Sequence, residues 1–431
     1  MRLLIVSQYF WPENFRVNDL AAELIARGHE VTILTGEPNY PDGFVFPDYR
    51  HDPGRFATFN GAPVVRVPIL PRGRGGVRLA LNYLSFVATA STLGVWKLRR
   101  GRYDAIFVFQ TSPITAAIPA LILRSRHRAP VLMWILDVWP DTLAAIGVVK
   151  SARLLRLVGH MVRAIYRRCD LILVQSRAFF ANVLQHGGTE EQLRYFPNWP
   201  EPVFAPGQAL ADPAPELSAY EDCFKLLFAG NMGDAQDFPT LLDAAERLRD
   251  EPRLRWIIVG DGRVADMVRA EIERRGLGQQ VLLLGRYPIE RMPSFFEAAD
   301  ALLVSLRNEP IWAMTIPGKV QSYLAAGKPI IGVLNGEGAR VIEESGAGLV
   351  APAGDSAALA ERIRTLMARS QDERSAMGAR GAEYGHRAFD RTRLMDAVES
   401  WFAEAALRRN GSASSSDSSR PAASGPGPDS P

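Results

Sequence analysis

The sequence predicts an α/β protein in which two doubly wound parallel sheets follow one another along the chain. Two observations carry this prediction. Short runs of β-branched and apolar residues alternate with helical patterns along most of the chain, and a proline-rich stretch interrupts the alternation once. The chain has 431 residues, which is too long for a single hydrophobic core, so more than one domain is expected.

The first half contains candidate strands that are apolar on both faces, as buried parallel strands are. They lie at residues 3–7, 31–35, 64–67, 105–109, 131–136, 171–174 and 193–196. Helical patterns separate them at residues 18–27, 77–99, 114–124, 151–168 and 177–186, and Ser176 is the expected N-cap of the last. Strands that alternate with helices pair in parallel, so residues 1–200 are predicted to form a first domain.

Residues 201–222 are predicted to link two domains, because five prolines lie between Pro200 and Asp222 among few periodic apolar residues. The alternation then resumes and predicts a second domain at 223–390. Its expected strands lie at 225–229, 256–259, 281–284, 301–305, 329–333 and 348–350, and its expected helices at 239–249, 264–275, 290–298, 317–326, 339–344 and 357–367. An amphipathic helix is expected at 391–407, and residues 410–431, which are rich in Ser, Gly, Pro and Ala, are predicted to be disordered.

The composition narrows the class of protein. Two cysteines far apart in the sequence imply no disulfide framework and fit the cytosol. None of the six histidines has metal-ligand spacing, so no bound metal is expected. The first ten residues resemble a strand more than a signal peptide. Residues 1–200 carry a net charge of +10 and residues 201–431 one of −7, which suggests that the first half meets an anionic partner such as a membrane surface, a phosphorylated acceptor or nucleic acid.

The stretch at 315–332, TIPGKVQSYLAAGKPIIG, predicts a helix that opens at Pro317 and a buried strand after it. Gly318 and Lys319 stand at the start of this helix. Free backbone N–H groups, the positive end of the helix dipole and a nearby ammonium together suit a phosphate group. The chain has only five lysines against 45 arginines, which favours a specific role for Lys319. The alternative is an ordinary surface lysine.

Four loops of the second half are expected to converge on one crevice, because ligands of open parallel sheets bind at the carboxyl ends of the strands. These loops are 230–236, 260–262, 285–288 and 309–319. Their glycines allow close approach of backbone N–H groups to a nucleotide, with its phosphates near Lys319 and its base near Arg286. Alternatively, the glycines merely end strands. The candidate binding residues are Gly230, Asn231, Gly233, Gln236, Gly260, Asp261, Gly262, Arg286, Thr315, Pro317, Gly318 and Lys319.

Neither dinucleotide binding nor ATP hydrolysis finds its usual motif. No GxGxxG follows the first strand, and no GxxxxGK[ST] occurs anywhere in the chain.

Three loops of the first half are candidates for binding a second substrate. Loop 7–18 is aromatic and polar and can stack on a ring or bond hydroxyls, although it can equally be a surface loop that caps the first helix. The DVWPD segment after residue 136 places two carboxylates four residues apart, either to accept a hydroxyl proton or to cap a helix. The candidates are Asp137 for catalysis and Glu13, Asn14, Gln110, Trp139 and Asp141 for binding.

The helical pattern at 77–98 is apolar but contains Asn82 and several Ser and Thr residues, so a membrane span is not expected. Two alternatives stay open: a buried helix packed on the sheet, or an interfacial helix in contact with anionic lipid. The arginines that bracket it are Arg72, Arg74, Arg78, Arg99, Arg100 and Arg102.

Five segments, taken in order, resemble the retaining nucleotide-sugar glycosyltransferases of family 4. They are RLLIVSQYFWPEN with LAAELIARGHEVTILTG, LLFAGNMGDAQDFPTLLDAA, IIVGDGR, LLGRYPIERMPSFFEAADALLVSL, and TIPGKVQSYLAAGKPIIG with GARVIEESGAGLVAPAGDSAALAE. The resemblance covers about residues 1–405 and is greatest to the colanic-acid and O-antigen branch, including the fucosamine-transferase type. It implies the GT-B fold, in which two Rossmann-like domains face a cleft.

The resemblance also implies a reaction. Such enzymes move a sugar from a nucleotide diphosphate to an acceptor hydroxyl, retain the anomeric configuration and need no metal or other cofactor. The donor, here expected to be a UDP-linked N-acetylated or deoxy sugar, binds the C-terminal domain. The acceptor, expected to be a polyprenyl-diphosphate-linked saccharide for exopolysaccharide or O-antigen assembly, binds the N-terminal one. Protein groups then mainly position and neutralise charge. The implied location is the cytoplasm, at the inner face of the plasma membrane, and helix 391–409 is expected to cross back onto the first domain.

The sequence departs from this family at several positions. The usual donor-site glutamates fall on Met314 and Ser322, and Glu337 is a candidate for the missing carboxylate. The usual Arg and Lys after the first strand of the second domain fall on Asn231 and Gln236, and the usual acceptor-side histidine falls on Leu136; Lys319 matches the family.

Two alternatives to transfer remain at this point. One is a nucleotide-sugar 2-epimerase on the same fold, and the other is a non-catalytic subunit that binds nucleotide sugar.

Overall fold

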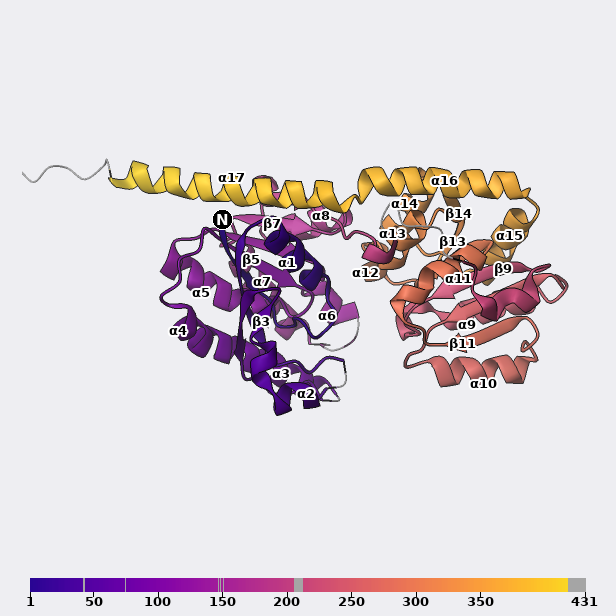
Figure 1. The fold of residues 1–431 in the computed structure, drawn as a ribbon, viewed down its shortest axis with the longest axis horizontal. Coiled ribbons are helices and arrows are strands. Elements are labelled where there is room, and N and C mark those ends of the chain that lie inside the picture. The colour runs from indigo at the N-terminus through magenta and orange to yellow at the C-terminus, as the bar shows by residue number, and fades with distance from the viewer. Residues whose placement is uncertain are drawn as a thin grey trace, which may run out of the picture.

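Two sheets form the framework of the protein in this computed structural model (Figure 1). The structure describes residues 1–417 apart from 42, 74, 146, 148, 150 and 205–211, so the middle of the predicted linker and Arg74 lie outside the described residues. The first sheet has eight strands in the order β3-β4-β2-β1-β5-β6-β7-β8, and the second has six in the order β11-β10-β9-β12-β13-β14. Among these pairings only β3 with β4 is antiparallel. The predicted fold class is confirmed.

The first sheet places its buried strands at the centre and helices on both faces. Strands β5, β6 and β7 are buried along their whole length, as strands covered on both faces are. The strands are β1 Arg2–Val6, β2 Glu30–Gly36, β3 Thr58–Phe59, β4 Ala62–Val67, β5 Ala105–Gln110, β6 Val131–Ile135, β7 Leu171–Val174 and β8 Leu193–Tyr195. The helices are α1 Arg16–Ala26, α2 Pro47–His51, α3 Gly76–Thr89, α4 Val95–Leu98, α5 Ala117–His127, α6 Asp141–Ala145, α7 Ala152–Tyr166 and α8 Ala178–Gln185.

The second sheet reverses its strand order between β9 and β12, which are hydrogen-bonded neighbours. Its strands are β9 Phe224–Ala229, β10 Leu254–Val259, β11 Val281–Gly285, β12 Ala301–Ser305, β13 Ile330–Val333 and β14 Gly348–Ala351. Its helices are α9 Phe238–Arg247, α10 Ala265–Arg275, α11 Met292–Ala298, α12 Pro310–Ala313, α13 Gly318–Ala325, α14 Glu337–Glu344, α15 Ser356–Met367 and α16 Gln371–Ala388. The loops after β9 and β12 therefore open at the point where ligands bind in such sheets.

Helix α16 was not predicted, because its packing face consists of small residues rather than an apolar stripe. Gly378, Gly381 and Gly385 recur every three or four residues on this face. A Cβ atom on Gly378 would lie 1.9 Å from the carbonyl oxygen of Gly327. The glycines thus let the α16 backbone lie directly against the end of α13.

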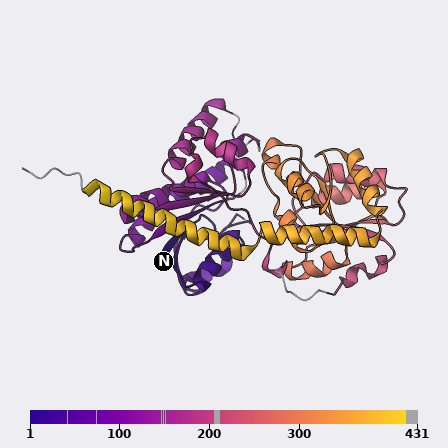
Figure 2. The same cartoon turned by 90° about the horizontal axis from the view of Figure 1, so that it is seen from above.

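Helix α17, Arg391–Asp417, runs from α16 along the first domain (Figure 2). Met395, Val398 and Phe402 are buried in the same core cluster as strands of the first sheet. Arg391 also pairs with Asp19 of α1 at 2.5 Å. The tail predicted from residue 410 is helical as far as Asp417, since extending an existing helix fixes only one residue per hydrogen bond; residues 418–431 lie outside the described part.

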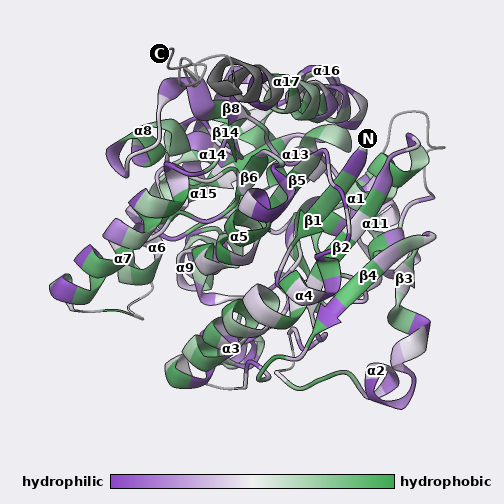
Figure 3. Cartoon of the chain, turned by 90° about the vertical axis from the view of Figure 1, so that its left-hand side faces the viewer, coloured by the Kyte–Doolittle hydropathy of each residue, from purple (hydrophilic) through white to green (hydrophobic). Residues whose placement is uncertain are grey.

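The predicted helix at 77–98 is α3, a short π-helical turn at Ala90–Gly94, and α4. One narrow face is buried, formed by residues spaced four apart: Asn82, Phe86, Ala90, Gly94 and Leu98. The remaining residues are half-buried or exposed, so the helix packs on the first domain through one face rather than being buried throughout. Its exposed apolar side chains are Val77, Leu81, Leu84, Leu93 and Trp96, and apolar residues are visible along α3 in Figure 3. By length and composition alone this helix could also cross a membrane, and only 22% of its most apolar window is buried.

Candidate active site

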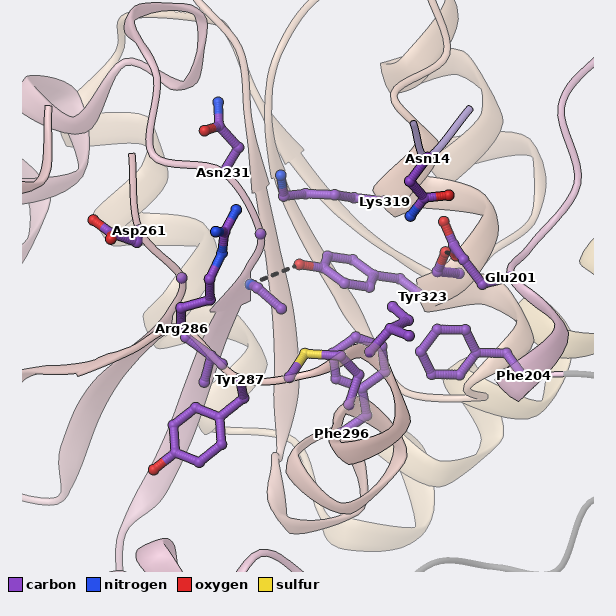
Figure 4. A pocket seen from close by; sticks show the side chains of 17 residues that line it. Asn14, Glu201, Phe204, Asn231, Asp261, Arg286, Tyr287, Phe296, Lys319 and Tyr323 are labelled. Carbon is purple, nitrogen blue, oxygen red and sulfur yellow. Dashed lines mark hydrogen bonds between the residues drawn. The ribbon is translucent and has the colours of Figure 1, made fainter. Parts of the chain in front are cut away.

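A cavity of about 420 Å³ lies at the carboxyl ends of β9, β10 and β11 and beside α13 (Figure 4). Asn231, Asp261, Arg286 and Lys319 gather on one side of it, and an aromatic and aliphatic floor lies on another. We call it the donor cavity, after the expectation that a nucleotide-sugar donor binds the second domain. It is lined by Asn14, Glu201, Phe204, Ala229, Gly230, Asn231, Val259, Gly260, Asp261, Arg286, Tyr287, Ile289, Met292, Phe296, Lys319, Ser322 and Tyr323.

A second cavity of about 960 Å³ lies between the two domains. We call it the cleft cavity. Arg72, Leu136, Ala145 and Gln175 line it from the first domain, whereas the loops after β9 and β12 and the start of α13 line it from the second. Asn231 and Lys319 line both cavities, so these two residues mark where the cavities meet.

Two glycines hold the loops of the donor cavity close together. Gly230 and Gly260 have φ values of 126° and 157°, a region that side chains other than glycine rarely adopt. A Cβ atom on Gly260 would lie 1.9 Å from the carbonyl oxygen of Gly230. Glycine is therefore required here for the strand ends to approach each other, and the backbone forms the wall of the cavity.

Lys319 is the central cation of this arrangement. Pro317 is the N-cap of α13 rather than its first residue, so Lys319 lies in the first turn. Its ammonium lies 4.7 Å from the centre of the Phe228 ring, and a Cβ on Gly230 would lie 2.8 Å from its Nζ atom. Burial lowers the pKa of the Lys319 ammonium to about 8. A desolvated cation at a helix N-terminus favours binding of an anion.

Eleven of the twelve predicted binding residues of the second domain line one or both cavities. The exception is Gly262, where a Cβ atom would lie 2.4 Å from the carbonyl oxygen of Met232. This glycine lets its backbone pack closely against the loop 230–236. These residues lie together because the carboxyl ends of parallel strands lie at one edge of the sheet; that they bind a nucleotide stays a prediction.

The predicted residues of the first domain are less well gathered. Asn14 lines the donor cavity rather than a separate acceptor site. Glu13 is only 2% exposed, and its carboxylate accepts hydrogen bonds from the backbone N–H groups of Phe10, Asn39 and Tyr40 at 2.8–3.1 Å. Glu13 thus holds two loops together and has little freedom to bind an acceptor.

The two carboxylates of the DVWPD segment are held by hydrogen bonds from neighbouring side chains. Asp137 accepts hydrogen bonds from Thr142 and from the indole N–H of Trp139, the latter at 3.3 Å. Burial raises the pKa of Asp137 above its usual range. Asp141 begins α6 and accepts a 2.5 Å hydrogen bond from Asn182. None of these residues lines the two cavities.

Gln110 is fully buried at the end of β5. Neither the nitrogen nor the oxygen of its side-chain amide has a hydrogen-bond partner within the described part of the chain. It also lines neither cavity.

Glu337 does not supply a carboxylate to the donor cavity. It accepts a hydrogen bond from the backbone N–H of Arg177 at 3.2 Å and pairs with Arg340 at 3.0 Å. Ser176, the predicted N-cap of α8, instead donates its hydroxyl hydrogen bond to the carbonyl of Met314. The bonds from Arg177 to Glu337 and from Ser176 to Met314 join the two domains outside the donor cavity.

Several cavity residues were missed by the sequence analysis. Glu201 reaches the donor cavity from the segment between the domains, next to Ser322. In the cleft cavity the missed residues are Arg72, Gln175, Arg263 and Arg307; Glu309 also lines it and belongs to the predicted loop 309–319. The position of Arg307 directly after β12, at the reversal of strand order, is a signal that could have identified it.

Comparison with known families decides what class of enzyme carries these cavities. The profile described as "Glycosyl transferase 4-like domain" matches residues 14–199, and the profile described as "Glycosyl transferases group 1" matches residues 223–369. The chain is a glycosyltransferase. The two matched regions fall on the two sheets, one domain each.

Curated relatives agree with this assignment. WcaI of Escherichia coli strain K12, a glycosyl transferase named for colanic acid biosynthesis, is 26% identical over 342 residues, which are 76% of this chain and 82% of WcaI. WbjE of Pseudomonas aeruginosa, also named as a glycosyltransferase, is 26% identical over 293 residues, 66% of this chain and 72% of WbjE.

Solved structures show the same two-domain arrangement. HepE of Anabaena, solved in complex with UDP, has a TM-score of 0.68 at 16% identity and covers 94% of this chain and 100% of its own. WaaG, a glycosyltransferase involved in lipopolysaccharide biosynthesis, has a TM-score of 0.63 at 15% identity over 92% of this chain and 98% of its own. The glycosyltransferase therefore has the GT-B fold.

The contacts of Glu13 make a testable prediction. In Glu13→Gln, an amide NH₂ must face backbone N–H groups that now donate to a carboxylate, so we expect the free energy of unfolding to fall by about 1–3 kcal/mol. Chemical denaturation measures this, with Glu30→Gln at an exposed position as the control. Unchanged stability together with a raised acceptor KM would contradict the role described and restore Glu13 to the acceptor site.

Proposed function

We propose that this glycosyltransferase moves a sugar from a UDP-sugar to a lipid-linked saccharide and retains the anomeric configuration. The observation that carries the proposal is Lys319, a desolvated cation in the first turn of α13, at the point where the donor and cleft cavities meet. A diphosphate bound there would leave the nucleoside on one side and the transferred sugar on the other.

In this proposal the nucleotide fills the donor cavity. The base lies beside Arg286 and Tyr287, and the diphosphate lies against Lys319 and the loop of Gly230 and Asn231. As the bond to the sugar breaks, negative charge grows on the leaving diphosphate. A cation and backbone N–H groups already fixed around it stabilise that charge in the transition state. Lys319 supplies the neutralising charge without need of a metal ion, and the leaving diphosphate takes the proton of the acceptor hydroxyl.

The identity of the donor is supported by a neighbour. HepE of the same fold is solved with UDP and with UDP-glucose, which favours UDP as the nucleotide here. The transferred sugar is proposed to be N-acetylated or deoxy, in line with the resemblance to the colanic-acid and O-antigen branch and its fucosamine-transferase type.

The acceptor is proposed to bind in the cleft cavity. Arg72, Arg263 and Arg307 line this cavity from both domains. One guanidinium group can donate two parallel hydrogen bonds to the oxygens of a phosphate. These three arginines therefore suit the diphosphate of a polyprenyl-linked saccharide. We place this transfer in exopolysaccharide or O-antigen assembly. The relative WcaI, which is named for colanic acid biosynthesis, supports this part of the proposal.

Lys319 gives the first test of the proposed function. We expect Lys319→Met to weaken UDP binding roughly 10–100-fold at pH 7, as loss of a charged hydrogen bond does. In the wild type without nucleotide the pKa of Lys319 is about 8. Raising the pH above 8 therefore removes the charge of the ammonium, and the affinity for UDP should fall by up to about tenfold per pH unit. The variant should lose this pH dependence.

Titration calorimetry with UDP between pH 7 and 9, with EDTA or with Mg²⁺ present, measures these effects. Lys328→Met is the matched control, because Lys328 pairs with Glu297 away from both cavities. The same Kd for the wild type and Lys319→Met would remove the phosphate role.

Enzyme given UDP-sugar and membrane-extracted lipid-linked acceptor should release UDP, whereas conversion of UDP-sugar alone would identify an epimerase.

A peripheral position on the inner face of the plasma membrane is the second part of the proposal. The outward face of α3 and α4 carries Leu81, Leu84 and Trp96, which are 44%, 61% and 59% exposed. Arg78 lies within α3 and Arg99 and Arg100 follow α4. An apolar ridge flanked by arginines suits the interface of an anionic bilayer.

Vesicle flotation tests this membrane contact. The wild type should float with vesicles that contain anionic phosphatidylglycerol at low salt, and Leu81→Asp with Leu84→Asp should abolish flotation, because carboxylates would face the lipid. Leu407→Asp, at a side chain of α17 that is 72% exposed, should float like the wild type. Equal flotation of all three proteins would contradict binding through α3.

A further inference from the structure

Glu201 brings a carboxylate into the donor cavity from the segment that joins the domains. The segment enters this position from a fixed point, since Trp199 is fully buried, stacks on Trp134 at 5.6 Å and donates to Asp19. Pro200 follows directly and restricts the backbone before Glu201. The carboxylate is therefore held at one place rather than free at a mobile surface.

Three elements of the chain meet at this carboxylate. One oxygen accepts a hydrogen bond from Arg16 at the start of α1, at 3.2 Å. The other accepts the hydroxyl hydrogen bond of Ser322 in α13. Arg16 belongs to the first domain and Ser322 to the second, so Glu201 lies between the two. Its side chain is 32% exposed, and Figure 4 shows it opposite the Arg286 side of the cavity, beside Asn14 and Tyr323.

Two cations lie near the Glu201 carboxylate. Arg16 contacts it directly, and Lys319 lies near enough for Glu201 to favour the charged form of the ammonium. A carboxylate offers about four lone-pair sites, and Arg16 and Ser322 use two of them. Acceptor capacity remains, and Glu201 lines the cavity.

A nucleoside diphosphate presents hydroxyl donors at one place only within this cavity. Its ribose lies between the base and the diphosphate, and carries neighbouring hydroxyl groups. The proposed function, on which this step rests, places the base beside Arg286 and the diphosphate beside Lys319, which leaves the ribose to the part of the cavity that Tyr323 and Glu201 line. We infer that Glu201 accepts hydrogen bonds from the ribose hydroxyls, with Arg16 and Ser322 as positioning residues.

If this assignment holds, binding of the nucleotide depends on how the two domains are placed relative to each other. The ribose would contact a residue that is itself held by α1 on one side and by α13 on the other. Discrimination between ribose and deoxyribose nucleotides would then depend on a contact at the junction, rather than on the second domain alone.

The test compares UDP with 2′-deoxy-UDP and 3′-deoxy-UDP by titration calorimetry on the full chain. For the wild type, at least one deoxy analogue should bind about tenfold or more weakly than UDP, as expected when a hydrogen bond to a charged group is lost. Glu201→Gln removes the negative charge and one of the two acceptor oxygens, and Arg16 competes for the oxygen that remains, so the ratio of the Kd values should fall to within about twofold of one. Ser322→Ala should lower UDP affinity and retain part of the ratio, because Glu201 remains but is less well held.

The matched control is Glu404→Gln. Glu404 also pairs with an arginine of the first domain, Arg194 at 2.7 Å, but outside the cavity. This variant should keep both the affinity and the ratio. A melting curve without nucleotide checks that each variant is folded.

The outcomes separate the two levels of the argument. Binding of UDP with an unchanged ratio in Glu201→Gln would overturn the ribose contact and leave the proposed function standing. Absence of UDP binding by the wild type would overturn both. Loss of affinity in Glu201→Gln with an equal loss for all three nucleotides would show that Glu201 acts only on the fold, and would also overturn the inference.

Discussion

The structure depends on one costly arrangement, a lysine ammonium held at the rim of a folded core. Lys319 lies over the ring of Phe228 and against the backbone of Gly230, and burial lowers its pKa to about 8. Taking a charge out of water is unfavourable unless a partner compensates. The start of α13 at Gly318 suits an anionic partner, because the first N–H groups of a helix have no partner within the helix and the dipole there is positive.

The remaining architecture serves to place two cavities on either side of that cation. The donor cavity lies at the ends of β9, β10 and β11. The cleft cavity lies where the strand order reverses between β9 and β12, and Arg72 and Gln175 of the first domain close it. Helix α17 holds the two domains in this relation by burying Phe402 and its neighbours in the core of the first domain. Glu201 adds a polar junction at the same boundary. The cleft cavity is therefore a site that neither domain forms alone.

Most of the fold and the donor-side residues were predictable, and the failures have physical reasons. The spacing of apolar residues along the sequence identifies long strands and helices. The parallel arrangement of the strands then brings their carboxyl ends to one edge of the sheet. Helix α16 was missed because its glycine face carries no apolar pattern. Glu13 and Asp137 looked available for chemistry, but hydrogen bonds within the first domain occupy them. Glu201 depends on contacts with Arg16 and Ser322, which are 185 and 121 residues away in sequence, and no local pattern predicts those.

The measurement that tests the central claim most directly is a crystal structure of the full chain soaked with UDP. The account predicts that the diphosphate lies within hydrogen-bond distance of the Nζ atom of Lys319 and of the loop that begins at Gly230. The uracil should then lie beside Arg286. A structure in which UDP binds at another place, while the donor cavity around Lys319 holds only solvent, would contradict the account.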